Sequence, residues 1–256
     1  MPVLLMTVWL TGCVQEELGS TPSPTGNGIR FTLTVPDVNL PSVSSRTMTG
    51  TGTAKKEDEI ETVDILVFDM SKTPAVYLEC VSATGVTQDL ADNSTVSFSA
   101  VLSPTTASTC IVVVANKELD NIVPGFIKGT TTKVEAMEKM LHTQTGKWLA
   151  DGSTTGGYTR IPMYGEKVIS KITPSMDPIT GINMKRMLAR IDIRNNSATS
   201  NFTVEEVYLA NYNTTGYIAP PWNTNGQVTE PAPDTPVLPV NSGKMTEEGD
   251  AILYSV

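Results

Sequence analysis

The sequence contains too little histidine and cysteine for most catalytic and metal-binding sites. It has one histidine, His142, and three cysteines, and none of the cysteines forms a Cys-x-x-Cys pair. This excludes zinc and redox motifs. No nucleophile sequence surrounds His142, and the acidic residues lack the spacing of a calcium-binding loop. We therefore expect no enzymatic activity, no cofactor and no bound metal.

Positive charge is also scarce. The chain has 18 Lys and Arg residues against 27 Asp and Glu residues, which gives a formal net charge of −9. Nonspecific binding to nucleic acid needs clustered Lys and Arg, so this class of function is excluded. The stretch Gly50–Lys56 fails the spacing of a phosphate-binding loop.

Aromatic residues make up 6% of the chain, which weakens the case for a glycan-binding or hydrolytic protein. Trp9 lies in the N-terminal apolar run, which leaves Trp148 and Trp222 to form a sugar-binding platform. No pair of carboxylates is placed for glycoside cleavage. In contrast, Thr, Ser, Val and Gly are plentiful, and these residue types favour strands and turns.

The chain begins with a pattern typical of a lipoprotein signal. The apolar segment Pro2–Leu10 is too short to span a bilayer, and it leads into Leu-Thr-Gly-Cys, which resembles a bacterial lipobox ending at Cys13. A basic segment is missing before it, and the alternative is a short apolar terminus with a chance cysteine. We expect residues 1–13 to be a signal peptide and Cys13 to carry lipid, followed by a polar tether up to Asn27.

The other two cysteines, Cys80 and Cys110, fall in predicted strands. They could pair in an oxidising compartment, or they could be two small buried apolar residues. The second interpretation is slightly favoured.

The first predicted strand covers residues 29–35. It alternates, with four apolar residues on one side and Arg and Thr on the other, and Pro36 ends it because proline cannot donate to a ladder. The apolar set is Ile29, Phe31, Leu33 and Val35.

A loop rich in Ser, Thr and Gly follows, from Leu40 to Lys56, and Arg46 is its only arginine. Such a loop should be exposed and easily cut. A cut at Arg46 would release the first strand from the chain that it helps to complete. The charged run Lys55–Glu59 is interpreted as a solvated turn before the second strand, at 62–68.

Further strands are predicted at 75–81, 95–101 and 109–116, with turn residues between them, which is typical of a β-sandwich. The last of these is continuously apolar and should be central. One helix is predicted over 132–141, with an apolar face and His142 at its end. The apolar face consists of Val134, Met137 and Leu141.

A domain boundary is expected between residues 172 and 180, where Pro174 and Pro178 interrupt the pattern. The predicted units are an N-terminal β-sandwich at 47–172 and a C-terminal one at 180–256. The second unit has predicted strands at 187–194, 202–212 and 251–256, too few to complete a sandwich.

Five stretches follow one another along the chain. They are the lipobox, the first strand with its arginine loop, and the runs Glu59–Asp69, Ile161–Glu166 and Met187–Ile193. In their order, these stretches resemble the fimbrillin precursors of Bacteroidales, the FimA-type major fimbrial subunits of type V pili. The resemblance extends from Cys13 to about Tyr217.

The resemblance implies a mainly β fold with two transthyretin-like β-sandwich domains, and export as a lipoprotein to the outer membrane. An arginine-specific protease then cuts the Arg46–Thr47 bond, so that 14–46 is a propeptide. Loss of the first strand opens a groove, which a strand of a neighbouring subunit fills. The partners would be copies of this chain or accessory subunits, in a fimbrium on the cell surface.

Fimbrillin chains usually extend further, so the second sandwich is expected to be incomplete. A subunit ending at Val256 would accept a strand without donating one. The alternatives are a lipid-anchored pilus base, tip or adhesive surface lipoprotein that keeps its first strand, and, less favoured, a glycan-binding lipoprotein.

Overall fold

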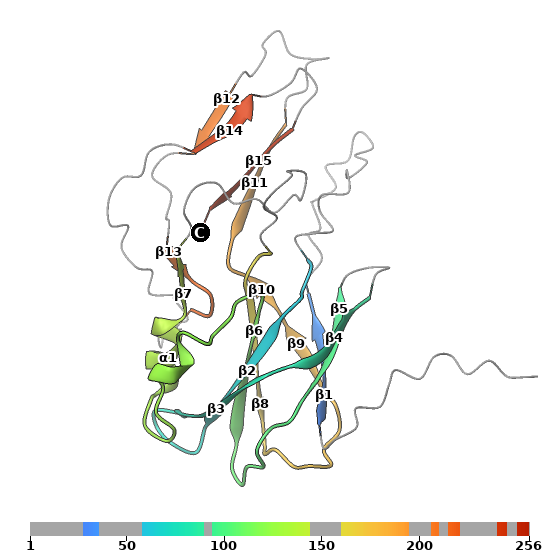
Figure 1. Ribbon diagram of the computed structural model, residues 1–256, viewed down its shortest axis with the longest axis vertical. Helices are drawn as coiled ribbons and strands as arrows, with labels where there is room; N and C mark the ends of the chain where they lie inside the picture. The colour runs from blue at the N-terminus through green and yellow to red at the C-terminus, as the bar shows by residue number, and fades with distance from the viewer. Residues whose placement is uncertain are drawn as a thin grey trace, which may run out of the picture.

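The computed structural model describes residues 28–35, 58–89, 94–143, 160–194, 206–209, 215–220, 240–244 and 250–255. The fold is mainly β, as predicted. Two sheets pack face to face as a sandwich, in the lower half of Figure 1, and paired strands of the second half lie above it.

The first sheet has four strands, and the first strand of the chain is one of its two inner members. Its inward side chains alternate with outward polar ones, as the period of two requires. The order across the sheet is β4 (Thr84–Gln88), β5 (Thr95–Ala100), β1 (Ile29–Thr34) and β9 (Ile179–Asn183).

The second sheet has five strands and is built around β6 (Thr109–Ala115). Every residue of β6 is buried, which confirms the prediction that this apolar run is central. The order is β10 (Lys185–Arg186), β8 (Met163–Ile169), β6, β2 (Val63–Asp69) and β3 (Val76–Ser82).

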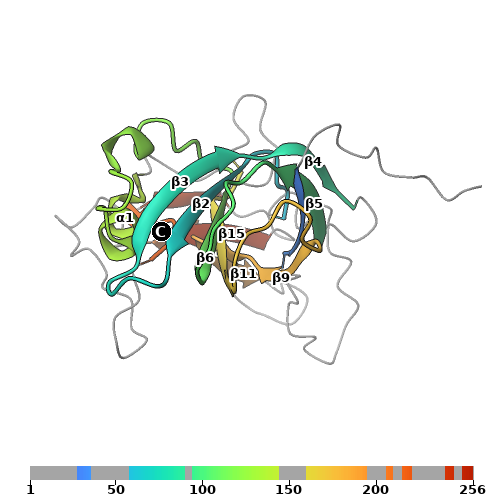
Figure 2. The ribbon, with the colours of Figure 1, turned by 90° about the horizontal axis from the view of Figure 1, so that it is seen from below.

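The five-stranded sheet has an apolar core on each of its faces. One core fills the space between the two sheets and includes the inward side chains of β1. The other lies between the five-stranded sheet and a layer that contains α1 (Lys133–Lys139) and the 3₁₀ helix η2 (Val123–Gly125). Seen from below, α1 and β1 lie on opposite sides of β2 and β6 (Figure 2). The sheet therefore separates β1 from the helical layer.

The helix is shorter than predicted and presents a different face. Thr132 caps its start, because its hydroxyl accepts a hydrogen bond from the backbone N–H of Glu135. Ala136 and Met137 are buried, whereas Val134 is 47% exposed. The prediction that Val134 and Leu141 share the buried face is therefore wrong.

The helix ends early because the chain turns into β7 (Leu141–Thr143), which pairs with β13 (Thr215–Tyr217). His142 thus lies in a strand opposite Gly216, and not at a helix end as predicted. Pairing across the sequence overrode the local helical pattern.

Beyond Arg186 the chain contains more strands than predicted, and those that the structure describes form two-stranded pairs. Two of these pairs lie above the sandwich in Figure 1, and the third joins β13 to β7. The two upper pairs are β11 (Ala189–Arg194) with β15 (Asp250–Ser255), and β12 (Glu206–Leu209) with β14 (Val240–Lys244).

The first sandwich continues past residues 172–180, where we expected a domain boundary. Strand β9 pairs with β1, and Ile182 and Met184 belong to the core between the sheets. Residues 179–186 therefore pack within the first sandwich, although the sequence assigned most of them to the second unit. The cause is a strand that the sequence pattern did not reveal.

The interpretation of Lys55–Glu59 as a solvated turn is wrong for Asp58, which is only 7% exposed. Cys80 and Cys110 are both free thiols. They lie on β3 and β6, which flank β2 on opposite sides. Two strand spacings of about 4.8 Å separate their backbones, more than a disulfide can bridge.

Candidate strand-exchange site

Strand β1 is held on both sides by backbone pairing. It runs antiparallel to β5, with Phe31 opposite Phe98, and parallel to β9, with Phe31 beside Ile179. Beyond its end, the N–H of Val35 donates to the carbonyl of Ser94 at 2.7 Å. Loss of β1 would therefore leave β9 without a paired strand and β5 with one unpaired edge.

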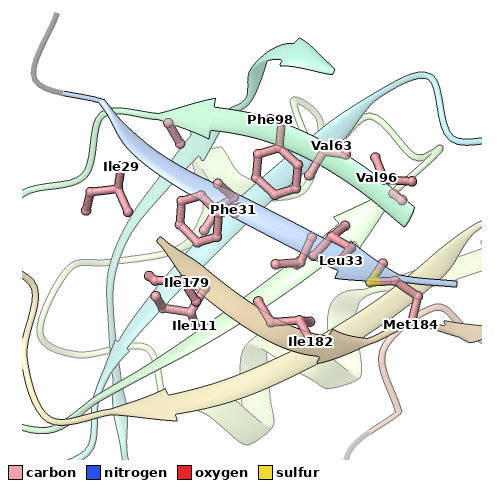
Figure 3. Close-up of a cluster of buried hydrophobic side chains, with 14 of the residues drawn as sticks. Ile29, Phe31, Leu33, Val63, Val96, Phe98, Ile111, Ile179, Ile182 and Met184 are labelled. Atoms are coloured by element: carbon pink, nitrogen blue, oxygen red, sulfur yellow. The ribbon is translucent and has the colours of Figure 1, made fainter. Parts of the chain in front are cut away.

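All four apolar residues that alternate along this segment are buried. Figure 3 shows three of them pointing into the core between the sheets. Their exposed fractions are Ile29 4%, Phe31 1%, Leu33 0% and Val35 1%. We use the name slot for the space that these side chains fill between β5 and β9. That another strand can occupy the slot stays a prediction.

An aromatic pair marks the middle of the slot. The rings of Phe31 and Phe98 are stacked, with centroids 5.0 Å apart and planes 7° from parallel. Phe98 is 4% exposed, so both rings are removed from water. Stacked aromatic pairs contribute about 0.5–1.5 kcal/mol beyond their buried area.

The other wall of the slot, β9, contains a bulge. Phe31 pairs with Ile179 and Leu33 with Ile182, so β9 uses one extra residue over this step. Gly181 has φ +71°, a conformation that glycine adopts without strain. Residues three apart normally face opposite sides of a strand, and the bulge lets Ile179 and Ile182 both point inward (Figure 3).

The floor of the slot is the five-stranded sheet, and β9 crosses it at Gly165 of β8. A Cβ on Gly165 would lie 2.8 Å from the carbonyl oxygen of Asn183 and 2.8 Å from Ile182 Cγ2. The close approach of β8 and β9 therefore requires glycine at this position. Met184, which follows β9, is fully buried and its N–H donates to Thr34 at 2.9 Å.

The chain that enters β2 is anchored to both sheets. Asp58 forms an ion pair with Arg186 of β10. Gln88, at the end of β4, donates to the carbonyl of Asp58 at 2.7 Å and accepts from the N–H of Ile60 at 3.0 Å. These hydrogen bonds and the ion pair hold residues 58–60 through groups that do not belong to β1.

Asn116 ties the same segment to the end of β6. Its amide donates to the carbonyls of Glu59 and Ile161 at 2.8 and 3.0 Å, and its oxygen accepts from the N–H of Glu61 at 3.0 Å. Arg160 adds ion pairs to Glu59 and Glu61 at 3.0 and 2.7 Å.

The predicted processing residues, Cys13, Arg46 and Thr47, lie outside the described residues, as do Trp148 and Trp222. The sequence pattern found the four residues of β1 but missed Phe98 as the partner of Phe31, and it missed the roles of Gly181 and Gly165 in placing β9. The glycines gave a signal, since an isolated glycine in a strand pattern marks a bulge or a close backbone approach.

Other kinds of site find little support in the part of the chain that the structure describes. No cluster of His, Cys, Asp and Glu side chains there could hold a metal ion, and no helix there has the length and apolarity to cross a membrane. A hollow of about 240 Å³ lies beside Glu79 and Lys128 and has no aromatic residue in its lining. The carboxylate of Glu79 already accepts hydrogen bonds from the N–H and hydroxyl of Ser103.

Comparison with known proteins places these features in a family. No curated protein matches the sequence. Similar crystal structures include a candidate cell adhesion protein from Parabacteroides distasonis, with 17% identity, TM-score 0.49, and 90% of this chain and 70% of that chain covered. A fimbrial assembly protein from the same species has 12% identity and TM-score 0.44, with 90% and 77% covered. A candidate adhesin from Bacteroides ovatus has 13% identity and TM-score 0.43, with 90% and 68% covered.

The family profile described as major fimbrial subunit protein (FimA) matches residues 29–186, which begin with β1 and end with β10. This match covers more than half of the 256 residues. The resemblance inferred from the sequence is confirmed: the chain belongs to the FimA family of major fimbrial subunit proteins.

Proposed function

We propose that this protein is a fimbrial subunit that is exported as a lipoprotein, cut after Arg46 and assembled by donor-strand exchange in the slot of β1. Membership of a major fimbrial subunit family supports a structural role at the cell surface, in contact with other subunits. The lipid would be attached to Cys13, and an arginine-specific protease would cut the Arg46–Thr47 bond.

The observation that supports strand exchange is the interior position of β1. A strand at a sheet edge can leave without opening the core, but β1 lies between β5 and β9 and fills the slot with four apolar side chains. At about 1.5–3 kcal/mol for each buried side chain, an empty slot forfeits roughly 6–12 kcal/mol, which is an upper estimate. This is comparable with a typical domain stability of about 5–15 kcal/mol. An empty slot would therefore strongly favour capture of a replacement strand.

The connections on either side of β1 fit such an exchange. The predicted cut falls between β1 and Asp58, and residues 58–60 have polar contacts to Arg186 and Gln88 that do not involve β1. After a cut at Arg46, the chain from Asp58 onward would keep its anchor while β1 leaves. Backbone pairing to β5 and β9 would then give affinity to an incoming strand.

The test is the Arg46→Ala variant in the native host. We expect a longer, membrane-attached form that does not polymerise, because β1 stays covalently joined to the domain. Arg46→Lys keeps the charge and should also block processing if the protease is specific for arginine. Arg30→Lys is the matched control, since Arg30 is exposed on β1 outside the loop and its replacement should leave fibres normal.

The intact mass of the mature protein distinguishes this proposal from the alternative of a lipid-anchored base, tip or adhesive lipoprotein. A mature chain that begins at Thr47 supports the processed subunit, and a chain that begins at lipidated Cys13 in assembled fibres supports the anchored one. Normal fibres from the Arg46→Ala variant would overturn processing at this bond.

A further inference from the structure

We propose that the slot selects an incoming strand with an aromatic residue opposite Phe98, and that Phe98 sets the register of that strand. The inference rests on the proposed function, since it concerns the strand that replaces β1. The occupant is a segment of a second fimbrial subunit. Its chemistry follows from the geometry around Phe31.

The middle of the slot fits a flat ring. Phe31 lies against Phe98 with their planes 7° from parallel, and at 1% exposure it has no room to move toward solvent. On the other side of the ring lies Ile179 of β9 (Figure 3). An aliphatic residue at this place would leave the face of Phe98 partly uncovered and a void in the core.

The neighbouring places in the slot are of a different size. Along β5, the residues that face the slot are Ala100, Phe98 and Val96, opposite Ile29, Phe31 and Leu33. A slip of one residue would turn every apolar side chain outward. A slip of two would bring the incoming ring against Val96 or Ala100 and an aliphatic residue against Phe98. Only one register covers Phe98 with a ring and fills all the apolar places.

The bulge in β9 shapes the other side of the slot. Because Gly181 has φ +71°, the step from Ile179 to Ile182 matches a step of two residues on β1. A strand shifted by two residues would present the same backbone to this bulge, so the side chains that meet Phe98, Ile179 and Ile182 distinguish the registers. The partner strand therefore has an aliphatic residue, an aromatic residue and two more aliphatic residues at alternate positions.

Peptide exchange into the full chain tests this selection. The chain would have a single site for a sequence-specific protease in place of residues 43–49, so that β1 stays bound after the cut. Labelled peptides then compete for the slot: the natural segment of residues 28–35, and the same peptide with Phe31→Leu and Leu33→Phe exchanged. The two peptides have the same composition and apolar area. A Thr32→Ser peptide is the control, since Thr32 faces away from the core.

We expect the natural and control peptides to enter equally well and the exchanged peptide to bind at least about 10-fold more weakly. The acceptor variant Phe98→Leu should reduce this preference by about 2- to 12-fold, the range given by the energy of an aromatic pair. Equal binding of the natural and exchanged peptides would overturn the inference and leave strand exchange intact. If no peptide, including the natural one, enters the slot, strand exchange itself fails.

The uncut chain gives an independent measurement. The folding equilibrium constants of Phe31→Leu, Phe98→Leu and the double variant form a cycle. We expect the effects to be non-additive by about 2- to 12-fold. Additive effects would overturn the role of Phe98 whatever the outcome with peptides.

Discussion

Asp58 and Arg186 lie 128 positions apart in the sequence and form an ion pair between the segment that leads into β2 and strand β10. Asp58 is the first described residue after the loop that holds Arg46, and Arg186 is the last residue matched by the family profile. The pair therefore joins the first described residue after this loop to the last residue of the matched range. In the proposed mechanism it also retains the chain that remains after processing.

Breaking this pair should be strongly destabilising, because the side chains of Arg186 and Asp58 are only 17% and 10% exposed. Asp58→Asn leaves the guanidinium without its counter-charge, and we expect it to lower the free energy of unfolding by about 3 kcal/mol. Glu61→Gln is the matched control, since the Glu61 side chain is 60% exposed where it pairs with Arg160, and it should cost at most about 1 kcal/mol. Urea denaturation measures both, and equal losses would contradict the prediction.

Asn116 combines an unusual backbone with three side-chain hydrogen bonds. Its φ is 59°, in the left-handed region. Asn116→Gly keeps this conformation and loses the hydrogen bonds, which we expect to cost about 1–3 kcal/mol. Asn116→Ala loses the same bonds and adds backbone strain of about 1–2 kcal/mol. Thermal and urea unfolding should rank the alanine variant below the glycine variant, and a reversed order would refute the assigned role of the backbone.

How far the sequence predicted the fold depends on whether each strand has a regular pattern. Strand β1 alternates and β6 is continuously apolar, so both were recognisable from sequence alone. Strand β9 was missed because its inward residues, Ile179 and Ile182, are spaced by three. That spacing matches neither a strand nor a helix unless the bulge at Gly181 is known.

Only part of the candidate site could be predicted from the sequence. Alternation identified the inward residues of β1. It could not reveal that Phe31 and Phe98 stack, because register between strands 67 positions apart in the sequence is decided by packing. The predictions of the helix end and of the position of His142 were wrong for the same reason, because β7 forms through its pairing with β13.

Gly165 should be intolerant of any side chain. In Gly165→Ala, the new Cβ would meet the carbonyl oxygen of Asn183 and Ile182 Cγ2 at 2.8 Å, so β9 would have to move. We expect a loss of about 1–3 kcal/mol in the free energy of unfolding and weaker retention of β1. Gly125→Ala is the control, because a Cβ there meets nothing within 4 Å. Similar stability of the two variants would contradict the close approach.

Alkaline pH should destabilise the protein. Burial raises the pKa of Cys80 to about 12 and the pKa of Tyr77 to about 12, whereas in an unfolded chain these groups titrate near about 8.5 and 10. The unfolded state therefore loses protons first, so stability is complete below about pH 8 and falls as pH rises toward 12. Cys80→Ala should make this decline shallower. Urea denaturation between pH 8 and 11 tests this, and identical slopes for both proteins would contradict it.

The two faces of the five-stranded sheet should respond differently to mutation. Ile218 is fully buried in the core on the helix side, where its N–H donates to the carbonyl of Met140 at 2.9 Å, whereas Ile182 is fully buried beside β1. We expect Ile218→Ala and Ile182→Ala each to lower the free energy of unfolding by about 2–4 kcal/mol.

Only Ile182→Ala should speed the release of β1 from the cut chain under native conditions, because Leu33 pairs beside Ile182 in the slot. Ile218 contacts the opposite face, so its truncation should leave release unchanged. Release is followed by exchange against an excess of labelled peptide of residues 28–35, after urea unfolding has established that the two variants are equally destabilised. If both variants release β1 equally fast, the sheet does not separate the slot from the helical layer. Slower exchange of both the wild type and Ile218→Ala than of Ile182→Ala would mean that β1 leaves without disturbing the core on the helix side of the sheet.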